Sequence, residues 1–292
     1  MAINAALVKE LRERTGAGMM DCKRALVDAD GDLDQASEVL RKTGQAKADK
    51  KAARVAAEGK VIVKSTDDGS RHVVVEVNSE TDFVAKDENF AEFAEAVAEI
   101  ALAGDFADVA DLMAADSGGK TLETRRQELV AKVGENIAVR RFEGLRSEGT
   151  VGAYSHMGRI GVLVEIRGGD QDLARDLAMQ VAATAPRYVS DAEVPEDELG
   201  KEREILTAQA LLEGKPEDIV QKMVEGRLRK HLDGITLTGQ PFVKDPDTRV
   251  AKLLSAVDAS ALGFVRYEVG EGIEKKADDF VQEVMAQASQ SR

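Results

Sequence analysis

Two short runs of β-branched residues lie close together in the chain: Lys60-Val-Ile-Val-Lys64 and His72-Val-Val-Val-Glu-Val-Asn78. Valine and isoleucine favour extended backbone, because their branched side chains pack well on a pleated surface. Asp67-Asp68-Gly69, which lies between the runs, is typical of a tight turn. We therefore predict a β-hairpin that begins near Glu58.

The segment after this hairpin predicts two helices and a closing strand. Four apolar residues recur at helical spacing, namely Phe90, Phe93, Val97 and Ile100. A further helix is expected around Leu122–Val133, and a strand is expected over Asn136–Phe142. The order of elements is therefore strand, strand, helices, strand.

The same order returns in the second half of the chain. The matching segments are a hairpin over Thr150–Tyr154 and Arg159–Ile166, a helix that begins at Asp170, and a strand over Phe264–Val269. Two halves of this kind predict an α+β protein with a duplicated core.

A long polar helical insertion, about Glu196 to Asp233, separates the last helix and strand of this second half. Gly214-Lys215-Pro216 breaks the insertion in its middle. The apolar residues of its two arms are Ile205, Leu206 and Leu212, then Ile219, Met223 and Leu228. One apolar seam on each arm predicts two antiparallel helices, a coiled-coil hairpin that protrudes from the body.

Residues 4–54 predict three short helices. Gly16-Ala17-Gly18 ends the first helix, because glycine permits positive φ. The second carries an apolar stripe of Met19, Cys22 and Leu26, and Asp32 is placed as the N-cap of the third. The charged tail, residues 47–54, has no apolar stripe and is predicted to be a partly helical linker.

These patterns divide the chain into four parts. The parts are a three-helix domain with its linker (1–54), a core N-subdomain (55–142), a core C-subdomain with the insertion (143–269), and a C-terminal module (270–292) with a helix around Asp278–Ala288.

Composition limits the classes of function. The chain has 292 residues, of which 43% are hydrophobic and 32% charged, as in soluble globular proteins with more than one core. No run approaches the ~20 apolar residues that a membrane helix needs, and the first residues resemble no signal peptide. Cys22 is the single cysteine, which excludes an internal disulfide and fits the cytoplasm. The net charge of −14, with +2 on residues 1–54 and −16 on the remainder, argues against a direct nucleic-acid binder.

The residues offer little for catalysis. His72, His156 and His231 are the three histidines, and none has another histidine or a cysteine at metal-ligand spacing. His72 is expected to be structural, since it lies in a predicted strand. Gly16-Ala-Gly18 lacks the third glycine of a dinucleotide fingerprint, and no phosphate-binding loop occurs. We expect no catalytic residue, metal or cofactor, and no nucleotide site.

The connection from the hairpin to the next helix, Asn78–Asp87, is chemically unusual. It places Phe83 and Val84 where a polar connection is expected. Periodicity favours Phe83 in the core, packed under the following helix with Phe90. The alternative is an exposed aromatic tip beside the Asp82 carboxylate, a shape suited to insertion into another protein.

Thr81-Asp82-Phe83-Val84-Ala85-Lys86-Asp87 resembles the signature of the translation elongation factor Ts family. Further resemblances follow in order along the chain: Val8–Lys23, Gly134–Ile137 with Arg140-Arg141, Arg159–Val164, Lys222–Arg227, Leu237–Val243 and Val269–Lys275. Each motif is weak alone, but together they span the chain. Two departures are visible: Ser79 stands where many relatives have cysteine, and Met157 lies in a stretch often richer in small residues.

The resemblance implies a guanine-nucleotide exchange factor. Such a factor would bind elongation factor Tu, both GDP-bound and nucleotide-free, disturb its magnesium site and promote GDP release so that GTP can bind. It also implies a ubiquitin-associated-like three-helix head, a duplicated core with an inserted coiled coil, and a C-terminal module. A 2:2 complex is left open.

The resemblance also implies roles for individual residues. Asp82 and Phe83 would intrude beside the magnesium site of the partner, and Thr81 and Val84 would hold the connecting loop. On the head, Met19 and Met20 would contact the nucleotide domain, although Met19 fits a core position equally well. His156 would face a more distant domain of the partner.

Two other classes compete with an exchange factor. The three-helix head and the coiled coil fit an adaptor or scaffold, whose partner binding would be indifferent to GDP. A hydrolase that uses Asp82 and His156 is a third and more distant alternative.

Overall fold

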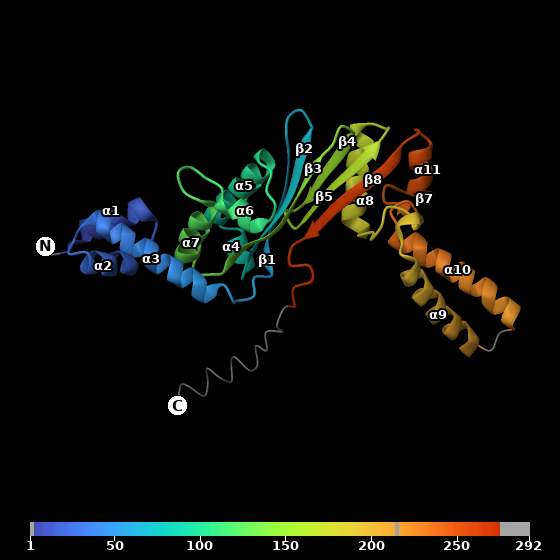
Figure 1. The fold of residues 1–292 in the computed structure, drawn as a ribbon, viewed down its shortest axis with the longest axis horizontal. Helices are drawn as coiled ribbons and strands as arrows, with labels where there is room; N and C mark the ends of the chain where they lie inside the picture. The colour runs from blue at the N-terminus through green and yellow to red at the C-terminus, as the bar shows by residue number, and fades with distance from the viewer. Residues whose placement is uncertain (1–2, 214–215, 275–292) are drawn as a thin grey trace.

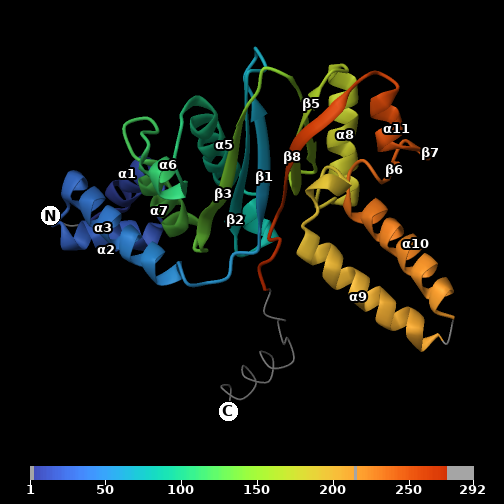
Figure 2. The same ribbon diagram turned by 45° about the vertical axis from the view of Figure 1, so that its right-hand side comes forward.

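Two three-stranded antiparallel sheets lie against each other in the middle of the computed structural model, which describes residues 3–213 and 216–274 (Figures 1 and 2). The first sheet contains β1 (Glu58–Ser65), β2 (Arg71–Ser79) and β3 (Ile137–Arg146), with β2 in the centre. The second contains β4 (Thr150–His156), β5 (Ile160–Arg167) and β8 (Ser260–Glu268), with β5 in the centre. The predicted hairpin at residues 60–78 is confirmed.

Helices cover the outer face of each sheet, so that four layers form (Figure 2). Those on the first sheet are α4 (Asp82–Ala85), α5 (Glu88–Ala103), α6 (Val109–Ala114) and α7 (Leu122–Val133). Those on the second are α8 (Gln171–Thr184) and α11 (Val250–Ser255), beside a small hairpin of β6 (Pro241–Phe242) and β7 (Asp245–Arg249). Helices and antiparallel sheets in one chain confirm the predicted α+β class.

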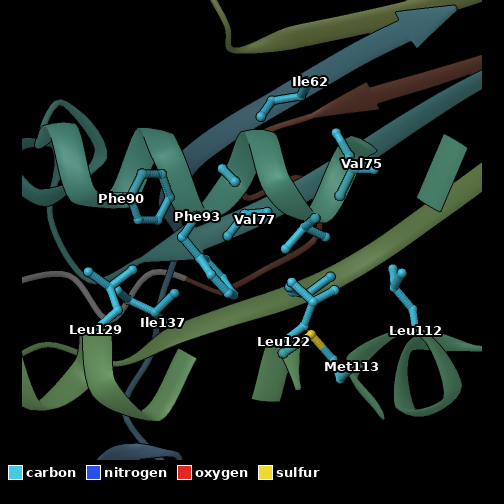
Figure 3. Close-up of a cluster of buried hydrophobic side chains, with 14 of the residues drawn as sticks. Ile62, Val75, Val77, Phe90, Phe93, Leu112, Met113, Leu122, Leu129 and Ile137 are labelled. Atoms are coloured by element: carbon cyan, nitrogen blue, oxygen red, sulfur yellow. The ribbon is translucent and has the colours of Figure 1, made fainter. Parts of the chain in front are cut away.

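Strand β2 divides its side chains between two cores, because successive residues point to opposite faces of a sheet. Val73, Val75 and Val77 join the buried cluster under the helices, which also contains Phe90 and Phe93 of α5 and Leu122 and Leu129 of α7 (Figure 3). Val74 belongs instead to the cluster between the two sheets. Both faces of β2 are therefore buried, which explains its nearly continuous apolar run.

Gly161 of β5 permits the close approach of the two sheets. A Cβ atom at this position would lie 2.4 Å from Cγ1 of Val61 and 2.8 Å from Cγ2 of Val63. A Cβ atom at these distances would force the valines or the sheets to shift, so glycine is what permits the observed approach.

The N-terminal helices α1 (Ala5–Thr15), α2 (Met19–Asp28) and α3 (Leu33–Lys51) form a separate small core at one end of the molecule (Figure 1). Helix α3 runs on to Lys51 and packs on α7, so the segment predicted as a linker is largely helical and in contact with the body. Ala48 is fully buried, and Gly44 faces Ala131 of α7. These small residues give no hydrophobic signal, yet they let two helices approach closely.

Helices α9 (Glu196–Leu212) and α10 (Glu217–Ile235) form the predicted antiparallel hairpin, which projects from the opposite end of the molecule (Figure 1). The predicted seam is partly wrong. The buried contact is made by Leu206, Ala210, Val220 and Val224, with Leu228 beside them. Ile205, Leu212 and Ile219 of the predicted seam are exposed instead. Residues four apart share one helix face, and the small Ala210 brings the helices together.

The helix predicted around Asp278–Ala288 lies outside the described residues. Within residues 3–213 and 216–274, no helix combines the length and the apolar character that a membrane span requires. A short 3-10 turn at Asp191–Glu193 leads from α8 towards the hairpin.

Candidate functional site

The connection between β2 and α5 contains a single helical turn, α4, rather than the open loop that the sequence suggested. Thr81 begins the turn as its N-cap, since its Oγ1 accepts a hydrogen bond from the Val84 N–H at 3.4 Å. The hydroxyl of Ser79 donates to the Thr81 carbonyl at 2.9 Å. Hydrogen bonds between near neighbours therefore hold Thr81 both to the end of β2 and to α4.

Phe83 projects from this turn into solvent. Its exposed fraction is 81%, whereas Phe90 of the next helix is fully buried. The interpretation that periodicity favoured, a core position for Phe83, is thus wrong. The cap at Thr81 sets the direction of the turn, so that Val84 and Ala85 face the core while Phe83 faces outward. A four-residue helix is too short for periodicity to reveal this.

Asp82 lies beside Phe83 and is half exposed. Its Oδ2 accepts a hydrogen bond from Nζ of Lys86 at 2.6 Å. This bond from Lys86 holds the pKa of the Asp82 carboxyl below its ordinary value. The exposed end of α4 therefore presents an aromatic ring next to an ionised carboxylate. An ion pair this exposed contributes little to stability, so Asp82 can exchange Lys86 for another partner at small cost.

The turn after α7, residues 134–136, binds the segment that leads into α4. The Thr81 N–H donates to Oε2 of Glu135 at 3.0 Å, and the Thr81 hydroxyl donates to Oε1 of the same carboxylate at 2.7 Å. The Asn136 N–H donates in return to Oε1 of Glu80 at 2.6 Å. Sequence reasoning quoted Gly134–Ile137 only as part of a resemblance and missed this contact, since no local pattern pairs residues 54 apart.

His156 lies at the turn between β4 and β5. Its Nδ1 is 3.1 Å from the hydroxyl of Tyr154, and its side chain is exposed. Met157 follows with a positive φ of 53° and an exposed fraction of 87%, and Gly158 continues the turn at 67°. Met157 was noted in the sequence only as a departure, but it is the most prominent apolar side chain of this turn.

The β4–β5 turn and α4 lie at the same end of β1. Glu58 at the start of β1 pairs in register with Ser79, which leads into α4. Glu58 also binds Nη1 of Arg159 at 2.8 Å, and the Val61 N–H donates to the Gly158 carbonyl at 2.8 Å. The structure thus brings Phe83 and His156 to one edge of the two-sheet body.

Met19 and Met20 lie elsewhere, on the first turn of α2 in the N-terminal helical unit (Figure 1). Both are exposed, at 56% and 66%, whereas Cys22 and Leu26 are buried. The core position that the apolar stripe suggested for Met19 is therefore wrong. Two adjacent exposed methionines form a small adaptable apolar surface.

Glu76 of β2 is a buried charge that the sequence analysis did not single out. A bulge in β3 places Arg140 outside the regular register, so that Arg140 and Arg141 both reach the Glu76 carboxylate, at 3.1 and 2.7 Å. The Gly270 N–H donates to it at 2.8 Å, and Asn78 donates at 3.0 Å. Burial acts to raise the pKa of Glu76, but these hydrogen bonds together hold it below its ordinary value. The cluster fastens the end of β8 to the first sheet.

The described part of the chain, 3–213 and 216–274, contains no group of three or more His, Cys, Asp or Glu side chains placed to hold a metal ion. The exposed features of the site are an aromatic ring, a carboxylate, a histidine and methionines, and exposed aromatic and methionine side chains are common on protein-binding surfaces.

Comparison with known proteins agrees with this character. The family described as Elongation factor TS matches residues 80–271. Elongation factor Ts of Thioalkalivibrio sulfidiphilus is 58% identical over 290 residues, which cover 99% of both chains. The protein of that name from Halorhodospira halophila is 57% identical over 291 residues and all of both chains, and that of Legionella pneumophila strain Lens is 55% identical over 286 residues and 98% of both.

These matches place the chain among the translation elongation factors. Within that class, it belongs to the elongation factor Ts family.

Proposed function

We propose that the chain is a guanine-nucleotide exchange factor, which binds elongation factor Tu in its GDP-bound and nucleotide-free forms and promotes GDP release so that GTP can bind. The observation that carries the proposal is the exposure of Phe83, 81%, on a helical turn that hydrogen bonds hold in place. A large apolar ring on a fixed support is suited to enter another protein.

Exchange requires only differential binding. A switch protein that holds GDP at nanomolar strength has about 12 kcal/mol of binding free energy to lose. Part of it comes from magnesium that bridges protein and phosphate oxygens. A factor releases GDP by binding the state in which these contacts are broken more tightly than the state in which they are intact. It needs neither a nucleotide site nor a catalytic group of its own, and we propose that this chain is not an enzyme.

Phe83 and Asp82 have distinct roles in this proposal. The Phe83 ring occupies space beside the magnesium site of the partner and displaces an element that orders the metal. The Asp82 carboxylate leaves Lys86 and pairs with groups of the partner that had faced the magnesium. Thr81 fixes the start of the turn, and Val84 anchors it in the core.

The remaining exposed groups extend the interface. Met19 and Met20 contact the nucleotide domain, and His156 contacts a more distant domain of the partner. Affinity then comes from several separated patches, which lets the α4 turn act on the metal without carrying the whole binding free energy. We leave open whether the assembly is 1:1 or 2:2, and we expect no direct contact with nucleic acid or membrane.

The finer architecture belongs to the same proposal. Residues 1–54 form a ubiquitin-associated-like domain, the two sheets form a duplicated core, and α9 and α10 form an inserted coiled coil; the C-terminal module expected at 270–292 lies mostly outside the described residues. A matching detail of the two sheets supports duplication. The central strand β2 pairs with β3 through a register shift between Glu76 and Val77, and the central strand β5 pairs with β8 through a register shift between Glu165 and Ile166. A translation factor of this kind acts in the cytoplasm.

The deciding experiment measures release of fluorescent GDP from elongation factor Tu with and without the chain. We expect release to accelerate with chain concentration, and we expect GDP to weaken the complex in return, because coupling between two ligands is reciprocal. Binding that is unaffected by GDP, with an unchanged release rate, would identify an adaptor instead.

A further inference from the structure

Two glutamates exchange hydrogen bonds between the segment before α4 and the turn after α7. Glu135 accepts both donors of Thr81, its N–H and its hydroxyl, on separate oxygens at 3.0 and 2.7 Å. Glu80 accepts the Asn136 N–H at 2.6 Å. Each segment therefore binds the backbone of the other through a glutamate side chain. These reciprocal bonds hold the two segments together at two points.

The same turn also holds the connection to the N-terminal helices. Nδ2 of the buried Asn136 donates to the Arg54 carbonyl at 2.8 Å, and Lys51 at the end of α3 donates to the Gly134 carbonyl. Arg54 further lies 3.6 Å from the Glu80 carboxylate. The turn 134–136 thus contacts both the segment before α4 and the chain at the end of α3.

We infer that Glu135 is a positioning residue for the exchange reaction: it holds α4 so that Phe83 and Asp82 project at a fixed angle. This inference rests on the proposed function and adds a residue that would act on exchange through Thr81 and α4. A ring can displace a partner element only if its own support resists displacement. Phe83 itself has few contacts, so the resistance comes from Thr81 through Glu135 and from Val84 and Ala85 in the core.

The chemistry requires a carboxylate at position 135. The two donors of Thr81 need two acceptor oxygens, and an ionised carboxylate supplies both. Glutamine has the same shape, but it offers one acceptor oxygen, can meet the Thr81 hydroxyl only as a donor, and makes neither bond to a charged acceptor. Aspartate keeps both oxygens on a side chain that is one methylene shorter and cannot reach both donors. Glu135→Gln should therefore loosen α4 without changing the size of the side chain.

The first measurement is hydrogen exchange at the Thr81 amide in the full chain. Because the bond to a charged acceptor is lost, we expect Glu135→Gln to speed exchange at this amide about tenfold. Glu128→Gln is the matched control: Glu128 lies on α7 and binds Lys120 at the surface, 2.5 Å away. It should leave the Thr81 amide unchanged. Unchanged protection of this amide in Glu135→Gln overturns the inference.

The second measurement is GDP release from elongation factor Tu in two backgrounds. We expect Glu135→Gln to slow accelerated release about tenfold when Phe83 is present. In the Phe83→Ala background, Glu135→Gln should have almost no further effect, because it acts through that ring. Equal losses in both backgrounds would show a general structural role and overturn the inference.

The two proposals fail in distinguishable ways. If the unmodified chain does not accelerate GDP release, the proposed function fails, and the Thr81 amide still decides whether Glu135 holds α4. If Glu135→Gln does not fold, as shown by its melting curve, Glu135→Asp takes its place in both measurements. Glu135→Asp should change them in the same direction, and unchanged Thr81 protection in that variant would count against the inference.

Discussion

Truncation of Phe83 to alanine should separate stability from function. About one fifth of this residue is covered, given its 81% exposure. A buried phenylalanine removes about 200 Å2 from water, so Phe83 buries roughly 40 Å2. At about 25 cal/mol per Å2, its loss costs about 1 kcal/mol of unfolding free energy. Truncation of the fully buried Phe90 should instead cost about 3–5 kcal/mol.

The effect of Phe83→Ala on exchange should be much larger than its effect on folding. If the ring couples the factor to the nucleotide, its removal should reduce that coupling by about 1–3 kcal/mol, or roughly 5- to 150-fold in the factor by which GDP weakens the complex, and accelerated GDP release should slow. GDP should also expel the variant from the complex less effectively than it expels the unmodified chain. Chelation of magnesium should reduce the difference in GDP release rate between Phe83→Ala and the unmodified chain. Chelator removes the metal directly, so the step that Phe83 assists is no longer needed.

The assay follows fluorescent GDP leaving elongation factor Tu, with and without chelator, beside thermal melts of each variant. Leu212→Ala is the matched control, since Leu212 is 89% exposed at the far end of the hairpin. This substitution should change neither the GDP release rate nor the melting temperature. A large fall in melting temperature for Phe83→Ala would refute the exposed position of the ring. A normal exchange rate in a stable Phe83→Ala variant, or a defect that ignores magnesium, would refute its role as a wedge.

Three further predictions concern the scaffold. Gly161→Ala should lower unfolding free energy by about 1–3 kcal/mol, because the added Cβ meets Val61 at 2.4 Å, whereas Gly263→Ala, with open space around it, should be nearly neutral in the same urea titration. Glu76→Gln should cost about 3 kcal/mol at pH 7. The depressed pKa of Glu76 stabilises the fold above the ordinary glutamate pKa, and this contribution is lost as the pH falls through the native value. The cost of Glu76→Gln should therefore shrink on acidification, and a cost independent of pH would contradict this account. Replacement of residues 200–230 by a short linker should leave a cooperative melt, since the hairpin seam is internal; a loss of cooperativity would show that the hairpin supports the body.

The sequence predicted those elements whose signal is local and repeated. The β-branched runs at 60–64 and 72–78 became β1 and β2, and the apolar period of Phe90, Phe93 and Val97 became α5. Asp32 is the N-cap of α3, as predicted, with its side chain bonded to the Gln35 N–H. In the strands and in α5, several residues carry the same information, so neighbouring contacts cannot reverse it; the Asp32 cap needs only a bond to a residue three positions away.

The predictions that failed depended on small or single residues. The segment at 47–54 was predicted to be a partly helical linker, and α3 does continue to Lys51. Its packing on α7 was not foreseen, because Gly44 and Ala48, which lie in that contact, carry no hydrophobic signal. The hairpin seam was assigned to large side chains such as Leu212, whereas the small Ala210 sets the contact. The apolar stripe left Met19 open between a core and a surface position, and the structure places it at the surface, on the first turn of α2.

The contacts that organise the candidate site were beyond local reasoning altogether. Glu76 binds Gly270, which is 194 positions away, and Glu135 binds Thr81 across 54. No periodicity or spacing pairs such residues, because folding alone brings them together. The physical pattern marked Phe83 and Val84 as unusual in a polar connection, but only the resemblance to a family favoured a partner-binding role over a core position.

The buried anchoring and the exposed tip of this site depend on each other. A ring that contacted its own core, as Phe90 does, would be held firmly but could not reach a partner. A ring on an unsupported loop could reach a partner, but ordering that loop would consume free energy of binding. In α4, the polar groups of Thr81 are bound by Glu135 and Ser79, Val84 faces the core, and Phe83 is left free. The ordering is therefore completed when the chain folds, so that the free energy of partner binding remains available to displace the nucleotide.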